Sequence, residues 1–233
     1  MGLRAAFFDV GDTLVEGWAP DYGLRARAAV ARRFGERHWY DAFFSARHEP
    51  EDEEAPGRQD TLGLIRRWWG EQAVTDPDVD PDELRQLLSL PLDTVTRLTD
   101  GAAEALRWCT RTGLRVILVT NTLWRGDDEV REDWRRFGLA EHISGVASSH
   151  SVGWRKPHRA MFERALELAE ARPEEAFMVG DRLYADIWGA RQLGIRGILR
   201  RTSGGPPQRP VDVTPDAVVG SLAELPAVVG AWR

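Results

Sequence analysis

The sequence predicts an α/β fold, in which a Rossmann-like doubly wound parallel sheet carries an inserted α-helical cap domain. Three continuous apolar runs at residues 5–8, 116–119 and 176–179 indicate strands that are buried on both faces, as in a parallel sheet. Each run ends abruptly in a polar group. Residues 12–100 show helical patterns with little strand signal, whereas strand and helix patterns alternate beyond them.

The expected elements follow in order along the chain. After the first strand, apolar periodicity predicts cap helices at about 21–46, 59–74 and 81–98, separated by Pro, Asp and Glu. The alternating part predicts helix 101–112, strand 115–120, helix 126–137, strand 143–147, helix 157–170, strand 176–180, helix 184–193, strand 195–199, a short strand 217–219 and helix 222–230. We therefore expect a core at 1–15 plus 98–233 and a cap at 16–97.

Polar side chains stand where three of these strands end. Asp9, Thr120 and Asp181 each follow an apolar run directly, and Asp186 lies five residues beyond Asp181. In open α/β sheets, ligands bind at the carboxyl ends of the strands. We expect these side chains to meet there, with Asp186 returned by a loop and the first turn of a helix.

The chain contains 31 lysine and arginine residues, and its one lysine is Lys156. An arginine-rich composition could leave one lysine at any position by chance. However, ammonium is a compact point charge, and a site that needs it would reject the wide guanidinium fork. Because Pro is favoured at the first position of a helix, Lys156-Pro157 predicts a lysine at a helix N-terminus beside the strand ends.

These residue types together indicate chemistry on phosphate. Two close carboxylates repel each other unless a cation lies between them, and Mg²⁺ is typically held by one or two carboxylates, waters and a substrate phosphate. Thr120 could donate to one phosphate oxygen, and Lys156 could neutralise another. One carboxylate would then be free to attack phosphorus as a nucleophile.

The order of these residues resembles the four motifs of the haloacid dehalogenase-like (HAD) hydrolase superfamily, in the subgroup with a helical cap inserted after the first motif. The resemblance covers about residues 4 to 200. Any one motif is weak alone, whereas four in order at predicted strand ends or helix starts are specific. The matching segments are Asp9-x-x-x-Thr13, Thr120-Asn121, Lys156-Pro157 and Gly180-Asp181-x-x-x-x-Asp186.

The resemblance implies a role for each matching residue. It makes Asp9 the catalytic nucleophile and, with the Gly11 carbonyl and Asp181, a ligand of Mg²⁺. Asp186 would bind the metal through water or orient another group. Thr120 would bind phosphate, and Lys156 would contact both the phosphate and the nucleophile. Asn121 and Trp18, which lie beside the second and first motifs, are further candidate substrate-binding residues.

One position departs from the phosphatase pattern of that family. Its acid–base Asp stands two residues after the nucleophile, where this chain has Gly11. Asp12 is adjacent, but consecutive residues of an extended chain project to opposite sides, so we expect it to point elsewhere. Either turnover is slow, or Asp12, a cap residue or the substrate supplies the proton, or the chain no longer needs turnover.

Three functions therefore remain open from the sequence. The first is a Mg²⁺-dependent phosphatase that acts on a small phosphomonoester through an aspartyl-phosphate at Asp9. The second is a binding or scaffolding protein that keeps the fold and the metal site but has weak or no turnover, an interpretation that Gly11 favours. The third is a metal-free haloacid dehalogenase, against which Asp181 argues, because dehalogenases of this superfamily as a rule lack such a fourth motif.

The composition bears on which partners the protein binds and on the cellular compartment in which it works. The net charge of −6 and the absence of a strongly basic segment make nucleic acid an unlikely partner. A single cysteine, Cys109, allows no internal disulfide and fits a reducing cytoplasm. We expect no signal peptide and no membrane helix, since charged residues interrupt the apolar runs. A small phosphorylated metabolite is the expected partner, and the oligomeric state is open.

Overall fold

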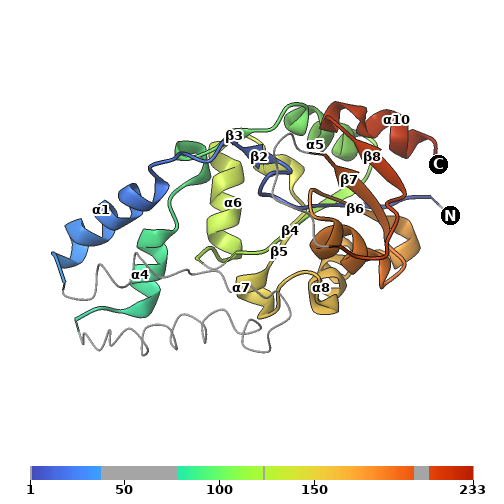
Figure 1. Ribbon diagram of the computed structural model, residues 1–233. Coiled ribbons are helices and arrows are strands. Elements are labelled where there is room, and N and C mark those ends of the chain that lie inside the picture. The colour runs from blue at the N-terminus through green and yellow to red at the C-terminus, as the bar shows by residue number, and fades with distance from the viewer. Residues whose placement is uncertain (1, 38–77, 123, 202–209, 233) are drawn as a thin grey trace.

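A six-stranded sheet forms the core of the protein (Figure 1). The computed structural model describes residues 2–37, 78–122, 124–201 and 210–232. All strand pairs in this sheet are parallel, in the order β5-β4-β1-β6-β7-β8. The strands are β1 (Ala5–Phe8), β4 (Arg115–Thr120), β5 (Gly145–Ser148), β6 (Ala176–Gly180), β7 (Arg196–Arg200) and β8 (Ala217–Val219). The predicted α/β class with a doubly wound parallel sheet is confirmed.

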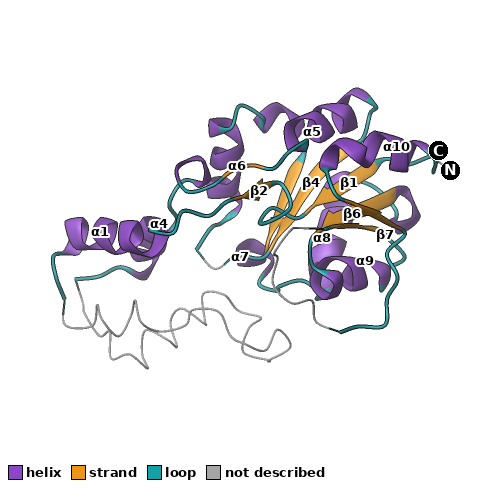
Figure 2. Ribbon diagram, turned by 45° about the horizontal axis from the view of Figure 1, so that its top comes forward, coloured by secondary structure: helices purple, strands orange, loops and turns teal. Residues whose placement is uncertain are grey.

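Helices cover both faces of the sheet (Figure 2). Successive residues of β1 point to opposite faces, so Ala6 and Phe8 join one buried cluster, whereas Ala5 and Phe7 join the other. The first cluster includes side chains of α5 (Ala102–Arg111), α6 (Asp127–Arg136) and α10 (Leu225–Gly230). The second includes α8 (Arg159–Ala169) and α9 (Gly189–Arg191). This two-sided burial explains why the strands are continuously apolar in the sequence.

Two cap helices are shorter than the periodicity predicts. Helix α1 (Tyr22–Phe34) ends at Gly35, whose φ of 72° is readily adopted by glycine. Helix α4 (Pro81–Leu88) is followed by a 3-10 turn (Leu92–Thr94) and by β3 (Arg97–Leu98) instead of continuing to 98. Pro91 explains the early end, since the residue before a proline is disfavoured in helical conformation. The expected helix at 59–74 lies outside the described residues.

The predicted helix at 157–170 begins two residues late. Helix α8 starts at Arg159, and the ring Nδ1 of His158 caps it by accepting from the backbone N–H of Ala160 at 3.2 Å. The Lys156–Pro157 peptide bond is cis. Because α8 starts at Arg159, the lysine lies in the loop before the helix, not at its N-terminus. The predicted helix at 184–193 is a π-helical segment (Leu183–Trp188) followed by α9.

The described cap helices pack on each other to one side of the sheet (Figure 1). The chain leaves the core through β2 (Val15–Glu16) and returns through β3, and these two strands pair antiparallel. The hydroxyl of Tyr22 in α1 donates to the Leu88 carbonyl of α4 at 2.9 Å. From the same helix, Arg85 donates to the carbonyl of Trp124 in the core at 2.7 Å. The division into a cap at 16–97 and a core stays a prediction.

No helix within the four described segments is both long and apolar enough to cross a membrane. The single cysteine, Cys109, is a buried packing residue of α5.

Candidate active site

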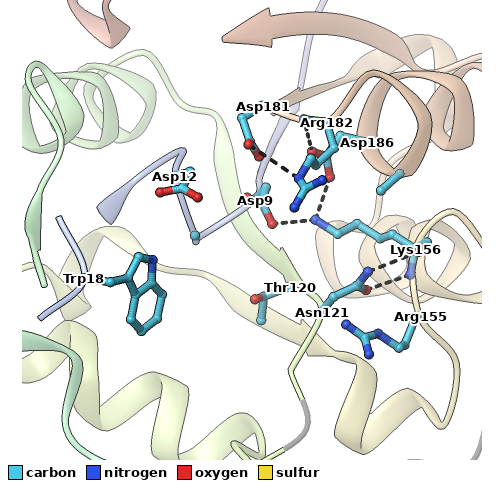
Figure 3. A pocket seen from close by; sticks show the side chains of 12 residues that line it. Asp9, Asp12, Trp18, Thr120, Asn121, Arg155, Lys156, Asp181, Arg182 and Asp186 are labelled. Carbon is cyan, nitrogen blue, oxygen red and sulfur yellow. Dashed lines mark hydrogen bonds and ion pairs between the residues drawn. The ribbon is translucent and has the colours of Figure 1, made fainter. Parts of the chain in front are cut away.

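The sheet brings the motif residues together at one edge. Strand β1 lies between β4 and β6, so the chain reverses its direction across the sheet beside it. Such a switch point opens a crevice at the carboxyl ends of the strands. A cavity of about 280 Å³ lies there (Figure 3). Its lining residues are Asp9, Gly11, Asp12, Trp18, Thr120, Asn121, Arg155, Lys156, Asp181, Arg182, Ala185 and Asp186.

Lys156 is the centre of this site. Its side chain is 2% exposed, and its Nζ donates to Asp9 Oδ1 and to Asp186 Oδ1, each at 2.6 Å. Burial alone lowers the pKa of the ammonium, but the charges of Asp186 and Asp9 outweigh burial and raise the pKa above its ordinary value. A compact cation thus bridges two buried carboxylates from different motifs, as the lone lysine of the sequence suggests.

Gly180 allows Asp186 to reach the lysine. A Cβ added at Gly180 would lie 2.2 Å from Asp186 Oδ2, so only glycine leaves room at the end of β6. That same oxygen accepts from the backbone N–H of Arg182 at 3.0 Å, while Oδ1 accepts from Lys156. Both oxygens of Asp186 are therefore engaged by the protein, an arrangement suited to orienting the lysine.

The acidic residues could hold a cation besides the lysine. One carboxylate oxygen from each of Asp9, Asp181 and Asp186 lies within 4.8 Å of the others. Burial, followed by the charges of Asp9 and Asp186, raises the pKa of Asp181 to about 8. A further positive charge would stabilise the ionised cluster, and oxygen donors suit a hard divalent ion. The residues present therefore fit a divalent metal.

The turn after β1 corrects one expectation. The backbone N–H groups of Leu14 and Val15 both donate to the Val10 carbonyl, at 2.9 and 3.0 Å, so the chain coils directly after Asp9. Asp12 has a φ of 54°, and alternation along an extended chain does not apply to it. Asp12 therefore lines the same cavity as Asp9 instead of pointing elsewhere. Burial and the charge of Asp9 raise its pKa.

Arg200 fixes this turn from the end of β7. Its side chain is buried, donates to the Asp12 carbonyl and pairs with Glu16 at 3.2 Å. The loop that carries Asp9, Gly11 and Asp12 is thus attached to the core by a residue distant in sequence.

Gly11 leaves open space in the cavity next to the side chain of Trp18. Its φ is not in the left-handed region, and the nearest atom to an added Cβ is Trp18 Cζ2 at 3.9 Å. The Trp18 ring is 46% exposed, lines the cavity and packs edge-on against Tyr22. Position 11 could therefore accept a side chain without backbone strain. Trp18 lies at the site, where the sequence predicted it.

Asn121 contacts the lysine loop. Its side-chain nitrogen donates to the Lys156 carbonyl at 3.1 Å, and its oxygen accepts from the Lys156 backbone N–H at 2.7 Å. The amide group thus holds both backbone polar groups of the lysine. This geometry favours a positioning role for Asn121 over the substrate contact that its place in the sequence suggested.

Three arginines near the motifs were not among the site residues that the sequence predicted: Arg125, Arg155 and Arg182. Arg155 and Arg182 line the cavity, and both are direct neighbours of motif residues, which was the available signal. Arg125 is largely buried and donates through Nε to Asp133 Oδ2 at 2.9 Å. Asp133 also accepts from the backbone N–H of Leu92 at 2.9 Å, which anchors the returning cap linker.

Comparison with known proteins establishes the family. A model of the haloacid dehalogenase-like hydrolases matches residues 3–194. The chain belongs to the HAD-like hydrolase family. Phosphoserine phosphatase from Thermus thermophilus is 30% identical over 254 aligned positions, which cover 96% of this chain and 98% of that protein. The protein is therefore a hydrolase whose relatives include phosphatases.

Solved structures with the same fold include a phosphatase and a haloacid dehalogenase, and both activities were left open by the sequence. A HAD phosphatase from Thermococcus onnurineus superposes with a TM-score of 0.64 at 21% identity, covering 98% of each chain. A 2-haloacid dehalogenase from Pseudomonas syringae has a TM-score of 0.66 at 24% identity, covering 99% of this chain and 100% of the other. At these identities the likeness establishes the fold, and the chemistry depends on the site.

A double-mutant cycle tests the contact between Asn121 and Lys156. Loss of two hydrogen bonds costs about 1–3 kcal/mol, so Asn121→Ala should lower hydrolytic kcat by roughly 5- to 150-fold with little change in KM. Because Asn121 would act through the lysine, the double variant with Lys156→Ala should be no worse than Lys156→Ala alone. Additive losses with a raised KM would instead identify Asn121 as a substrate contact.

Proposed function

We propose that this protein is a Mg²⁺-dependent phosphatase that cleaves a small phosphomonoester through an aspartyl-phosphate intermediate at Asp9. The observation that carries the proposal is the buried lysine bonded to Asp9 and Asp186, with Asp181 beside them. A buried ion pair contributes little to stability relative to apolar packing, so this arrangement points to chemistry. The phosphatase relatives support the same reaction class.

In this mechanism each side chain acts on the phosphate or on the nucleophile. The Asp9 carboxylate attacks phosphorus, while Lys156 holds it in place and donates to a phosphoryl oxygen. The Thr120 hydroxyl donates to another phosphoryl oxygen from the end of β4. Asp9, the Gly11 carbonyl and Asp181 would hold Mg²⁺, which neutralises charge that develops on the phosphoryl oxygens. Asp186 keeps the lysine oriented.

Gly11 determines which step is slow in this proposal. The leaving group needs a proton, and water must later be activated to hydrolyse the aspartyl-phosphate. Position 11 supplies neither, although Asp12 lines the cavity beside it. Both steps therefore lack a proton shuttle at position 11, and we expect breakdown, which also needs an activated water, to be the slower step, giving slow steady-state release after an initial burst.

Two other functions give different results in simple assays. A binding or scaffolding protein would release little or no phosphate from any phosphomonoester, with or without Mg²⁺, and without an initial burst. A metal-free dehalogenase would release halide in the presence of a chelator.

The proposed partner is a small phosphorylated metabolite and the proposed location is the cytoplasm.

Covalent capture tests the nucleophile and the metal together. With Mg²⁺ and beryllofluoride, a phosphoryl mimic, the wild-type protein should give a bound-fluoride signal in fluorine NMR and an Asp9 adduct in a crystal. Asp9→Asn should give neither, because the neutral amide is a poor nucleophile. Chelation of Mg²⁺ should abolish capture in the wild type. An unmodified Asp9 under saturating conditions would contradict the proposal.

Restoring a carboxylate at position 11 tests the missing proton shuttle. Gly11→Asp should raise steady-state turnover, because a general acid–base group contributes about 10²–10⁴ in rate and even a poorly placed one gives part of that. Gly11→Asn is the matched control, with the same size and no acid–base function. A Cβ at position 11 would meet Trp18 Cζ2 at 3.9 Å, an ordinary van der Waals contact.

The result that would refute this account is rapid hydrolysis by the wild type without gain in a folded, metal-binding Gly11→Asp variant. Loss of that rapid turnover in Asp12→Asn would then identify Asp12 as the group that already carries the proton.

A further inference from the structure

We propose that the substrate carries a second anionic group, a carboxylate or a second phosphate, and that Arg155 and Arg182 bind it. This inference rests on the proposed phosphatase function and specifies the substrate class. It makes the two arginines specificity-determining residues.

The cations that line the cavity divide into two kinds. Lys156 is committed to Asp9 and Asp186 at 2.6 Å each, and it serves the nucleophile and the transferred phosphoryl group. The other two cations in the lining are Arg155 and Arg182. They share the cavity with two further carboxylates, Asp12 and Asp181, which a bound divalent ion would help to neutralise.

The two arginines approach the cavity on either side of the lysine (Figure 3). Arg155 comes from the loop that carries Lys156, and Arg182 follows Asp181 after β6. The Arg182 side chain is 46% exposed, and its Nε lies 3.7 Å from Asp181 Oδ2, beyond hydrogen-bond distance. A divalent ion held by Asp181 would weaken that pairing further and leave the guanidinium available to a ligand.

The shape and chemistry of the cavity favour an anion at this position. A guanidinium is a planar fork that matches carboxylate or phosphate with two parallel hydrogen bonds. The wall formed by Gly11 and Trp18 offers apolar surface instead. At about 280 Å³ the cavity suits a small substrate, so both ends of that substrate would lie within reach of the lining residues.

Matched substrates test the proposal without any mutation. Phosphoglycolate and ethyl phosphate differ by a carboxylate, and propane-1,3-diyl bisphosphate and propyl phosphate differ by a second phosphate. The wild type should prefer the member with the second anionic group in at least one pair by about 10- to 100-fold in kcat/KM, the range that charge-assisted hydrogen bonds give. The pair that shows the preference identifies the second group.

Substitution of Arg155 and Arg182 tests whether these residues cause the preference for a second anionic group. Arg155→Gln and Arg182→Gln should each reduce it several-fold and together abolish it, because kcat/KM falls further for the substrate with a second anionic group than for ethyl phosphate or propyl phosphate. Arg159→Gln is the control, since Arg159 is exposed, pairs with Glu163 and does not line the cavity. Thermal unfolding of each variant checks that it folds.

Binding gives a readout independent of turnover. In the Mg²⁺-loaded protein, calorimetry should show phosphonoacetate binding more tightly than ethylphosphonate, or propane-1,3-diyl bisphosphonate more tightly than propylphosphonate, and the double arginine variant should lose that difference. Equal losses for both members of a pair would mean that the arginines contact the transferred phosphate and would overturn the inference. Absence of any phosphatase activity, by contrast, would refute the proposed function itself.

Discussion

The site is organised by one buried ammonium group. Lys156 Nζ lies 2.6 Å from carboxylates that come from the first and fourth motifs, in a place where its own desolvation is costly. The desolvation cost of the ammonium is offset only if the carboxylates of Asp9 and Asp186 stay ionised and close to it. Three features meet this condition: the end of β1 presents Asp9, glycine at position 180 leaves room for Asp186, and Asn121 holds the lysine backbone.

The parallel sheet supplies the frame for this contact. With β1 between β4 and β6, three polar strand ends face one crevice although they are more than fifty residues apart in sequence. Helix α4, in the segment predicted as the cap, connects to the same frame through the loop after β4. Arg85 of α4 bonds the Trp124 carbonyl, and Arg125 pairs with the buried Asp133 that holds Leu92. Helix α4 and the segment at Leu92 are thus attached to the loop that follows Thr120.

Much of this could be predicted from the sequence, because buried parallel strands are continuously apolar and their ends are marked by polar residues. The sheet and the motif residues at its edge follow from that pattern, whereas Trp18 was a candidate because it follows the first motif, and it lines the cavity. Local backbone geometry could not be predicted in the same way. Asp12 lines the cavity because the chain coils after Asp9, and α8 begins at Arg159 instead of Pro157. The arginines at the cavity were hidden by an arginine-rich composition in which such residues are mostly exposed.

The claim that a compact cation is required can be tested by comparing kcat/KM for a phosphomonoester in the wild type, Lys156→Arg and Lys156→Ala. A guanidinium fork cannot replace Nζ between two carboxylate oxygens 2.6 Å away without displacing one of them. The account predicts that Lys156→Arg is impaired nearly as severely as Lys156→Ala, with both variants folded by thermal unfolding. Activity of Lys156→Arg close to that of the wild type would contradict it.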